Sequence, residues 1–121
     1  MATSTIKASD IVGNNIGIPN QDTTYLSGIQ FRKIGRVVYM MSRTIKVYTA
    51  ITSGIDITLG TVPDEIKPID AVNVPMFNRN TGTFGELMIS TDGTVKFNKR
   101  SGTFTADTYC TIQGYSYISA S

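Results

Sequence analysis

The sequence predicts an all-β domain, and three observations lead to this prediction. The chain of 121 residues contains 15 Ile, 8 Val and 17 Thr, against 3 Leu and 6 Ala, and β-branched side chains favour pleated strands over helices. Short runs of alternating apolar and polar residues recur between clusters of turn residues, among them 11 Gly. No stretch of ten residues has the apolar period of a helix. These patterns fit an antiparallel sandwich, a jelly roll or a barrel.

Size, charge and hydropathy narrow the class of protein. A chain of 121 residues fits one domain with one core, and a content of 40% hydrophobic and 17% charged residues is typical of an ordered protein. The net charge is +2 and no run of Lys or Arg exceeds two residues, so we expect no nucleic-acid binding. Because no apolar run approaches the roughly 20 residues of a membrane-spanning helix, and the first residues lack an apolar signal region, we also expect no membrane insertion.

The first 25 residues have the weakest pattern. They are rich in Thr, Ser, Asn and Gly, with isolated Ile at positions 6, 11, 16 and 18. We expect residues 1–25 to form an extended lead-in or stalk segment with room for one short strand. The sandwich domain is then predicted to occupy residues 26–121.

Four strands are predicted between residues 29 and 60. Alternation over residues 29–34 is followed by Gly35-Arg36 and then by an apolar run over residues 37–41, which predicts a tight hairpin. The other two strands are each expected to bury one face. The residues on these faces are Ile45, Val47, Thr49 and Ile51 in the strand 43–51, and Ile55, Ile57 and Leu59 in the strand 55–60.

Residues 59–77 carry three of the four prolines and are predicted to include a rigid corner between two sheets. Pro63 and Pro68 lack a backbone N–H donor, so a central strand cannot run through them. Residues 64–67 are expected to form a single helical turn, and Ile66 and Ile69 to reach the edge of the core. A strand then resumes over residues 72–76.

The last third of the chain alternates between strands and polar loops. A polar loop is predicted over residues 77–83, and a strand over 84–90. Asp92-Gly93 predicts a type I′ hairpin into the returning strand, because both residues tolerate positive φ. Residues 98–107 are predicted to form an exposed loop. A tyrosine-rich strand over residues 108–118, bulged or broken at Gly114, completes the prediction.

The sequence offers little for catalysis. It contains no His, and therefore lacks the commonest general base and metal ligand. Cys110, the single cysteine, cannot form an internal disulfide and is expected to be a buried, inert thiol. The adjacent acids Asp64 and Glu65 are more typical of a turn than of a glycosidase pair, and Asp92-Gly93 is more typical of a hairpin than of a calcium loop. We expect no catalytic residue, no metal ligand and no cofactor.

Binding is better supported by the polar loops. Loops at one end of a sandwich commonly carry recognition, and a tyrosine ring with its hydroxyl can stack on a sugar. Two alternatives remain: the tyrosines can be core or subunit-interface residues, and Lys99-Arg100 can be a solvated loop tip. The candidate ligand-binding residues are Asn78, Arg79, Asn80, Lys99, Arg100 and Tyr109.

Five segments, in order, resemble the C-terminal domains of phage tail and minor structural proteins. Residues 31–39, FRKIGRVVY, resemble a strand pair of the type yrKiGnvVyv in that family, and residues 59–68, LGTVPDEIKP, resemble its corner iGTLPeGYRP. Residues 72–75 resemble the strand after the corner. Residues 85–95 resemble its G.l.I.tdGtV hairpin, and residues 115–119 its final strand. The aromatic residue of the family corner is absent here, where the corner reads Glu-Ile-Lys-Pro, so contacts near the corner are expected to differ.

The resemblance implies a jelly-roll-like antiparallel β-sandwich head domain of a tail-fibre, receptor-binding or baseplate protein. A homotrimer is implied, located at the phage tail tip in the virion and made in the host cytoplasm. The partners that the resemblance implies are a bacterial cell-surface saccharide and other phage tail or baseplate proteins. It also implies a binding protein without enzymatic activity. Two other functions remain open from the residues: a structural virion module without a host ligand, and a polysaccharide depolymerase.

Overall fold

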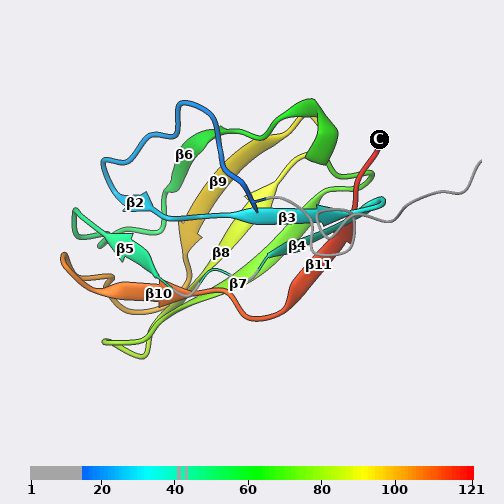
Figure 1. Cartoon of the computed structure of the whole chain (residues 1–121). Helices are drawn as coiled ribbons and strands as arrows, with labels where there is room; N and C mark the ends of the chain where they lie inside the picture. The colour runs from blue at the N-terminus through cyan, green and yellow to red at the C-terminus, as the bar shows by residue number, and fades with distance from the viewer. Residues whose placement is uncertain (1–14, 41, 43) are drawn as a thin grey trace, which may run out of the picture.

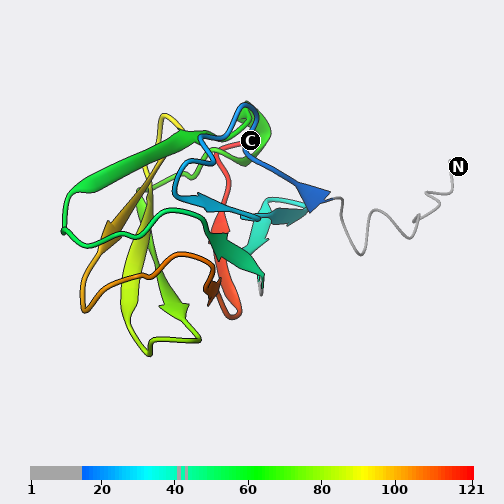
Figure 2. The same cartoon turned by 90° about the vertical axis from the view of Figure 1, so that its left-hand side faces the viewer.

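The computed structural model describes residues 15–40, 42 and 44–121, which form two antiparallel sheets packed face to face (Figures 1 and 2). The predicted all-β antiparallel sandwich is confirmed. One sheet has the order β1-β3-β4-β11 and the other the order β2-β5-β10-β7-β8-β9-β6. The strands of the first sheet are β1 (Asn15–Ile16), β3 (Phe31–Ile34), β4 (Val37–Met40) and β11 (Tyr115–Ile118). Those of the second are β2 (Leu26–Ser27), β5 (Ile45–Val47), β6 (Asp56–Thr61), β7 (Val72–Asn78), β8 (Phe84–Ile89), β9 (Thr94–Lys99) and β10 (Tyr109–Thr111).

The core lies between the two sheets and draws side chains from both. Phe31 and Met40 of the smaller sheet and Leu87 and Phe97 of the larger one are each at most 1% exposed. Burying a side chain of this size contributes about 1.5–3 kcal/mol relative to leaving it in water. The alternation of buried and exposed residues along β7, β8 and β9 therefore reflects one inner face and one outer face of the larger sheet.

The hairpin predicted at Gly35-Arg36 is confirmed. β3 pairs with β4 so that Ile34 lies opposite Val37, which leaves these two residues as the loop. Gly35 has a φ of 60°, and glycine with positive φ at the first loop position is the signature of a type II′ turn. Such a turn matches the twist of the two strands it joins.

The next two strands differ from the prediction: the first is shorter, and the second starts one residue later than predicted. β5 ends at Val47, and after it the chain leaves the sheet, so Thr49 is exposed, whereas Ile51 is buried through an isolated bridge to Phe104. Ile55 was expected in the buried face of the following strand but is 64% exposed. The prediction was wrong because pairing with β9 begins only at Asp56. Met41 and Arg43, at predicted strand ends, lie outside the described residues.

The proline-rich corner runs along the free edge of β11. Its single helical turn is confirmed as the 3-10 helix η1 (Asp64–Ile66). Ile66 is fully buried, but Ile69 is 53% exposed, contrary to prediction. Ile69 lies outside because its backbone N–H is directed to the carbonyl of Ile118 (3.0 Å). Pro68 bridges Ser119, so the corner covers an edge that would otherwise present unpaired backbone groups.

The β8–β9 hairpin forms where Asp92-Gly93 predicted it, but not with a type I′ turn. Gly93 has a φ of 91°, whereas Asp92 is not among the residues with positive φ. The N–H of Gly93 donates to the carbonyl of Ser90 (2.8 Å), and the N–H of Thr94 donates to Oδ1 of Asp92 (2.9 Å). The turn is therefore a three-residue loop that ends in a glycine bulge, and the Asp92 side chain stabilises it.

The segment after β9 differs most from the prediction. Residues 98–107 were expected to form an exposed loop, yet Asn98 is 7% exposed within β9 and Phe104 is fully buried. The ring of Phe104 packs on that of Phe97, with centroids 5.2 Å apart. The predicted break at Gly114 is confirmed: Gly114 has a φ of 59°, and the chain passes there from β10 in one sheet to β11 in the other.

Residues 15–25 are attached to the sandwich at several points. β1 is the short strand for which the sequence left room, and it pairs with β3. Ile18 is 7% exposed and belongs to the core. The N–H of Asp22 donates to the carbonyl of Leu59 in β6 (2.8 Å). Residues 1–14 of the predicted lead-in lie outside the described residues.

Candidate functional site

Asn78 ends β7, and its side chain holds the following loop. The side chain is buried, with the residue 1% exposed. Its Nδ2 donates to Oγ1 of Thr108 (2.7 Å), while its Oδ1 accepts the N–H groups of Asn80 (2.9 Å) and Thr81 (3.1 Å). All of these partners belong to the protein, so Asn78 shapes the site rather than facing a ligand.

Arg79, Asn80 and Tyr109 meet at the end of the sandwich that this loop forms. The N–H of Arg79 donates to the carbonyl of Tyr109 (2.9 Å), and the N–H of Tyr109 donates to Oδ1 of Asn80 (2.9 Å). The Arg79 guanidinium lies 5.8 Å from the centre of the Tyr109 ring, within the range of a cation–π contact. The Tyr109 residue remains 38% exposed. Three of the six sequence-predicted residues therefore form one surface.

Arg100 and Lys99 diverge from this group and from each other. The backbone N–H of Arg100 donates to the carbonyl of Phe84 (3.0 Å), and its guanidinium contacts the Glu86 carboxylate at 3.2 Å. Lys99 lies opposite Gly85 in register and alternates with outward residues, so it belongs to the inner side of β9 at the sheet's end. Neither Lys99 nor Arg100 therefore joins the group formed by Arg79, Asn80 and Tyr109.

Two phenylalanines and a Lys–Tyr pair, which the sequence analysis did not single out, extend the same surface. Phe77 and Phe84 lie opposite each other on β7 and β8, 48% and 42% exposed, with ring centroids 6.4 Å apart. Lys46 lies opposite Tyr109 on β5, and its Nζ is 5.1 Å from the centre of the Tyr48 ring. The signal in the sequence that could have identified this part of the surface is the presence of aromatic residues at positions expected to face outward. We call this surface the loop-end face; its residues are Lys46, Tyr48, Phe77, Arg79, Asn80, Phe84 and Tyr109.

Arg79 is the cation of the loop-end face that is available to pair with a ligand. Lys46 contacts the Asp107 carboxylate at 3.6 Å, and Arg100 is paired with Glu86. Among residues 15–40, 42 and 44–121, no carboxylate lies within ion-pair distance of Arg79. Exposed aromatic rings beside an unpaired guanidinium and the Asn80 side chain can stack on a ligand and donate hydrogen bonds to it.

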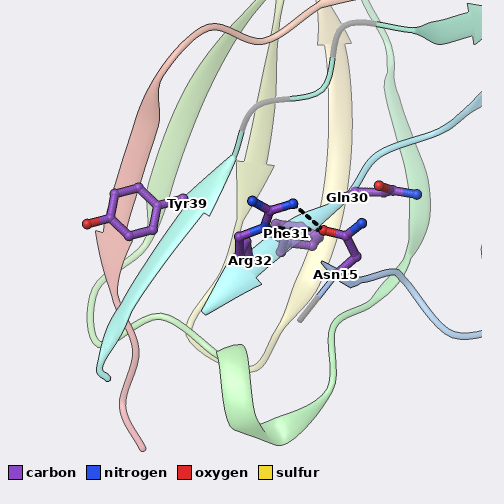
Figure 3. Close-up of a pocket in the computed structure, with 5 residues that line it drawn as sticks. All are labelled: Asn15, Gln30, Phe31, Arg32 and Tyr39. Atoms are coloured by element: carbon purple, nitrogen blue, oxygen red, sulfur yellow. Dashed lines mark hydrogen bonds between the residues drawn. The ribbon is translucent and has the colours of Figure 1, made fainter. Parts of the chain in front are cut away.

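A hollow of about 260 Å³ lies on the outer face of the smaller sheet (Figure 3). Arg32 on β3 and Tyr39 on β4 are directly opposite in register. The Arg32 Nε and Nη2 donate to Oδ1 of Asn15, at 3.3 and 3.0 Å. We call this hollow the Arg32 pocket; its lining residues are Asn15, Gln30, Phe31, Arg32 and Tyr39.

The residues considered for catalysis have structural roles. Burial raises the pKa of the Cys110 thiol to about 12, so the nucleophilic thiolate is scarce at neutral pH. Asp64 contacts the Lys67 ammonium at 2.6 Å, and this hydrogen bond lowers the pKa of the exposed Asp64 carboxyl. In the part of the chain that the structure describes, no three acidic, Cys or His side chains gather as metal ligands. No described helix is long and apolar enough to cross a membrane.

Comparison with known proteins finds a likeness in fold. No family model matches the chain, and no curated protein matches it in sequence. Among solved structures, the chain is similar to the head domain of the lactococcal phage bIL170, which is described in connection with a common fold of lactococcal phage receptor binding domains. The two share 14% sequence identity with a TM-score of 0.53, over 87% of this chain and 94% of the phage domain. At this identity the likeness establishes the fold.

Proposed function

We propose that the protein is a receptor-binding head domain of a phage tail, which attaches the virion to a saccharide on the bacterial surface without enzymatic action. The observation that carries the proposal is the shared fold with the bIL170 head domain over nearly the whole length of both chains. The sequence resemblance to phage tail and baseplate proteins supports the same function from independent evidence. A virion location at the tail tip follows from this role.

The loop-end face is the surface that we propose for attachment. Tyr109 offers an exposed ring, Arg79 a guanidinium without an ion-pair partner among the described residues, and Asn80 an amide beside them. Sugar rings carry apolar C–H faces and hydroxyl edges, so an aromatic face flanked by hydrogen-bonding groups suits both. Single sites of this kind are weak; a homotrimer would present three of them, and on a repetitive cell surface avidity would raise attachment strongly.

A second exposed surface supports contacts with further protein chains. Ile69 and Ile118 are 53% and 45% exposed, and they are neighbours because the Ile69 N–H donates to the Ile118 carbonyl. Exposed apolar side chains that lie side by side at a sheet edge offer a surface that another chain can cover. We propose that this edge contacts another copy of the chain or another tail or baseplate protein. A structural virion module without a host ligand is the alternative that this observation favours.

Attachment to cells tests the proposal directly. The fluorescently labelled protein is incubated with a panel of bacterial strains and with an array of bacterial surface glycans, and bound protein is measured. We expect binding to particular strains, and a loss of at least tenfold in Tyr109→Ala and Arg79→Ala. Lys96→Ala, a cation of the same sheet distant from the loop-end face, is the matched control and should bind as wild type.

Three outcomes would point elsewhere. A protein that binds no strain but joins other tail proteins would be a structural module. Strain binding that survives both loop-end substitutions would place the attachment site on another surface. The third outcome is a solution mass of one chain at every concentration, measured by light scattering coupled to size exclusion. This result would contradict the homotrimer.

A further inference from the structure

The Arg32 pocket is a concave site with the composition of a ligand site. It contains one cation, two side-chain amides and one aromatic ring, contributed by Arg32, Asn15, Gln30 and Tyr39. Phe31, which lies between Gln30 and Arg32 in the chain and whose side chain is buried in the core, also lines the hollow. A few convergent polar groups around a hollow are the usual form of a small-molecule site. The pocket belongs to the opposite sheet from the loop-end face and shares no residue with it.

The guanidinium of Arg32 is held in place with one edge open. A guanidinium has two edges that each present a pair of N–H groups: one formed by Nε and Nη2, the other by Nη1 and Nη2. Oδ1 of Asn15 accepts from Nε and Nη2 and so occupies the first edge (Figure 3). Within residues 15–40, 42 and 44–121 no group accepts from the Nη1–Nη2 edge. This edge keeps a parallel pair of donors, which matches the two oxygens of a carboxylate. Because Asn15 is neutral, its contact orients Arg32 without neutralising its charge.

The charge of the pocket favours a single negative charge on the ligand. Arg32 is the one cation that lines it, and in the described part of the chain no carboxylate lies within ion-pair distance of Arg32. The neighbouring Lys33 is directed elsewhere, since its Nζ donates to the carbonyl oxygens of Glu65 (2.7 Å) and Ser121 (3.2 Å). The single positive charge of Arg32 therefore matches a ligand that carries a single negative charge.

The remaining lining groups suit a sugar. In the part of the chain that the structure describes, the hydrogen bonds of Gln30 to Ser42 use only its backbone, so its side-chain amide can pair with hydroxyl groups. Tyr39 is 40% exposed and supplies a ring and a hydroxyl on the other side of Arg32. A volume of about 260 Å³ falls just below the range of about 300–1,000 Å³ for drug-sized ligands, which fits one monosaccharide unit.

We propose that the Arg32 pocket binds a carboxylate-bearing sugar unit of the uronic acid class, with the carboxylate on the open edge of Arg32. Acidic polysaccharides would present such units one at a time along the chain. The proposal shares the saccharide class with the proposed function, but its test uses a monosaccharide and does not depend on attachment to cells.

NMR titration of the ¹⁵N-labelled protein measures this binding. The probe is sodium methyl β-D-glucuronide, and the neutral comparison is methyl β-D-glucuronamide, which replaces the carboxylate by an amide of the same shape. We expect shifts of the amide signals of residues 30–32 and 39 with the glucuronide, and at least tenfold weaker binding of the glucuronamide. Inorganic phosphate is the third ligand, and it should compete weakly, because it lacks the sugar ring that Gln30 and Tyr39 contact.

Two substitutions and one control separate the chemistry of the site from folding. Arg32→Lys keeps the charge but loses the two-donor edge, and should weaken glucuronide binding about tenfold. Asn15→Ala frees the guanidinium and should weaken it several-fold. Lys96→Ala should bind the glucuronide as wild type does, because Lys96 lies on β9 of the other sheet and belongs to neither candidate site. Circular dichroism verifies the fold of each variant, and the exposed positions of Arg32 and Asn15 make unfolding unexpected.

Each contrary result overturns the proposal in a distinct way. No shifts at residues 30–32 and 39 at high glucuronide concentration would mean that the pocket is no sugar site. Equal affinity for the glucuronamide would refute the role of the carboxylate, and phosphate binding at least as tight as the glucuronide would identify a simple anion site. A protein that binds the glucuronide here yet attaches to no cell would leave this inference standing and refute the proposed function.

Discussion

Gly85 is the position at which one added methyl group tests the packing of the core most directly. It lies in β8 on the inner face of the larger sheet, and its φ is not positive, so alanine meets no backbone strain there. A Cβ atom at Gly85 would lie 2.5 Å from two ring carbons of Phe97 and 2.7 Å from the carbonyl oxygen of Asn98. The Phe97 ring is fully buried and packed on Phe104, so it cannot swing into solvent.

The size of the effect follows from two opposing contributions. In a strand without such a contact, alanine stabilises relative to glycine by about 0.5–1 kcal/mol, because the unfolded chain loses freedom. Overpacking a well-filled core costs about 1–3 kcal/mol. Because the added Cβ would lie only 2.5–2.7 Å from three atoms, we expect a cost in the upper half of that range, about 2–3 kcal/mol. After the gain of about 1 kcal/mol is subtracted, Gly85→Ala should lower the free energy of unfolding by about 1–2 kcal/mol, which is a large part of the roughly 5–15 kcal/mol that holds a domain together.

Urea denaturation followed by circular dichroism measures this difference. The m-value should stay constant while the midpoint falls, as expected for a change in stability alone. Gly17→Ala is the matched control, since no heavy atom lies within 4 Å of its added Cβ and its φ is not positive; its stability should stay within about 0.5 kcal/mol of wild type. If Gly85→Ala were as stable as wild type, the contact between β8 and the Phe97 ring would be wrong.

Three further predictions concern the core, the thiol and the loop. Phe104→Ala should cost about 3–5 kcal/mol in unfolding free energy, because it removes a buried ring, whereas the exposed Phe84→Ala should cost under about 1 kcal/mol in the same urea titration. Burial raises the pKa of the Cys110 thiol to about 12, so above about pH 8.5 the unfolded chain holds fewer protons than the folded one and the free energy of unfolding falls with rising pH. In thermal melts between pH 8.5 and 11, Cys110→Ala should make this decline less steep. An identical slope in wild type and variant would contradict the burial of the thiol. Asn78→Ala loses three hydrogen bonds and should lower the free energy of unfolding by about 1–3 kcal/mol. Amide hydrogen exchange at residues 80–81 should become faster. Unchanged exchange would show that the loop holds its shape without this side chain.

Period-two alternation was a reliable guide to the strands that pair over several residues. The inward positions of β7, β8 and β9 follow from the sequence because these strands pair at length, and the alternation there has room to repeat. Phe104 could not be found in this way. It enters the core through a single bridge to Ile51, surrounded by Gly, Ser, Thr and Asp, which are typical of loops. The turn type at Asp92 was also beyond reach, since a side-chain hydrogen bond to Thr94 decides it.

The candidate surfaces depend on register, which local sequence does not contain. Arg79 and Asn80 were named from their polar loop and Tyr109 from its aromatic ring in a predicted strand, but that they touch follows from the pairing of β7 with β10. Asn78 has the residue type of a ligand-binding side chain, and its burial became visible only in three dimensions. The Arg32 pocket requires residue 15 beside residue 32 and residue 32 beside residue 39, and none of these residues was singled out from the sequence.

The bridge between the corner and β11 has a consequence for how long the protein takes to fold. Arg36 donates to the carbonyl of Ser119 across 83 positions of the chain, and Tyr117 to that of Ile66 across 51. Contacts so distant in sequence form late, because the intervening chain must first lose its freedom. The smaller sheet therefore cannot close on the ribosome until β11 has emerged, and its completion is expected on a timescale of milliseconds to seconds. Until that moment the edge of β4 that pairs with β11 lacks its partner, and an unpaired strand edge makes the newly made chain prone to aggregation.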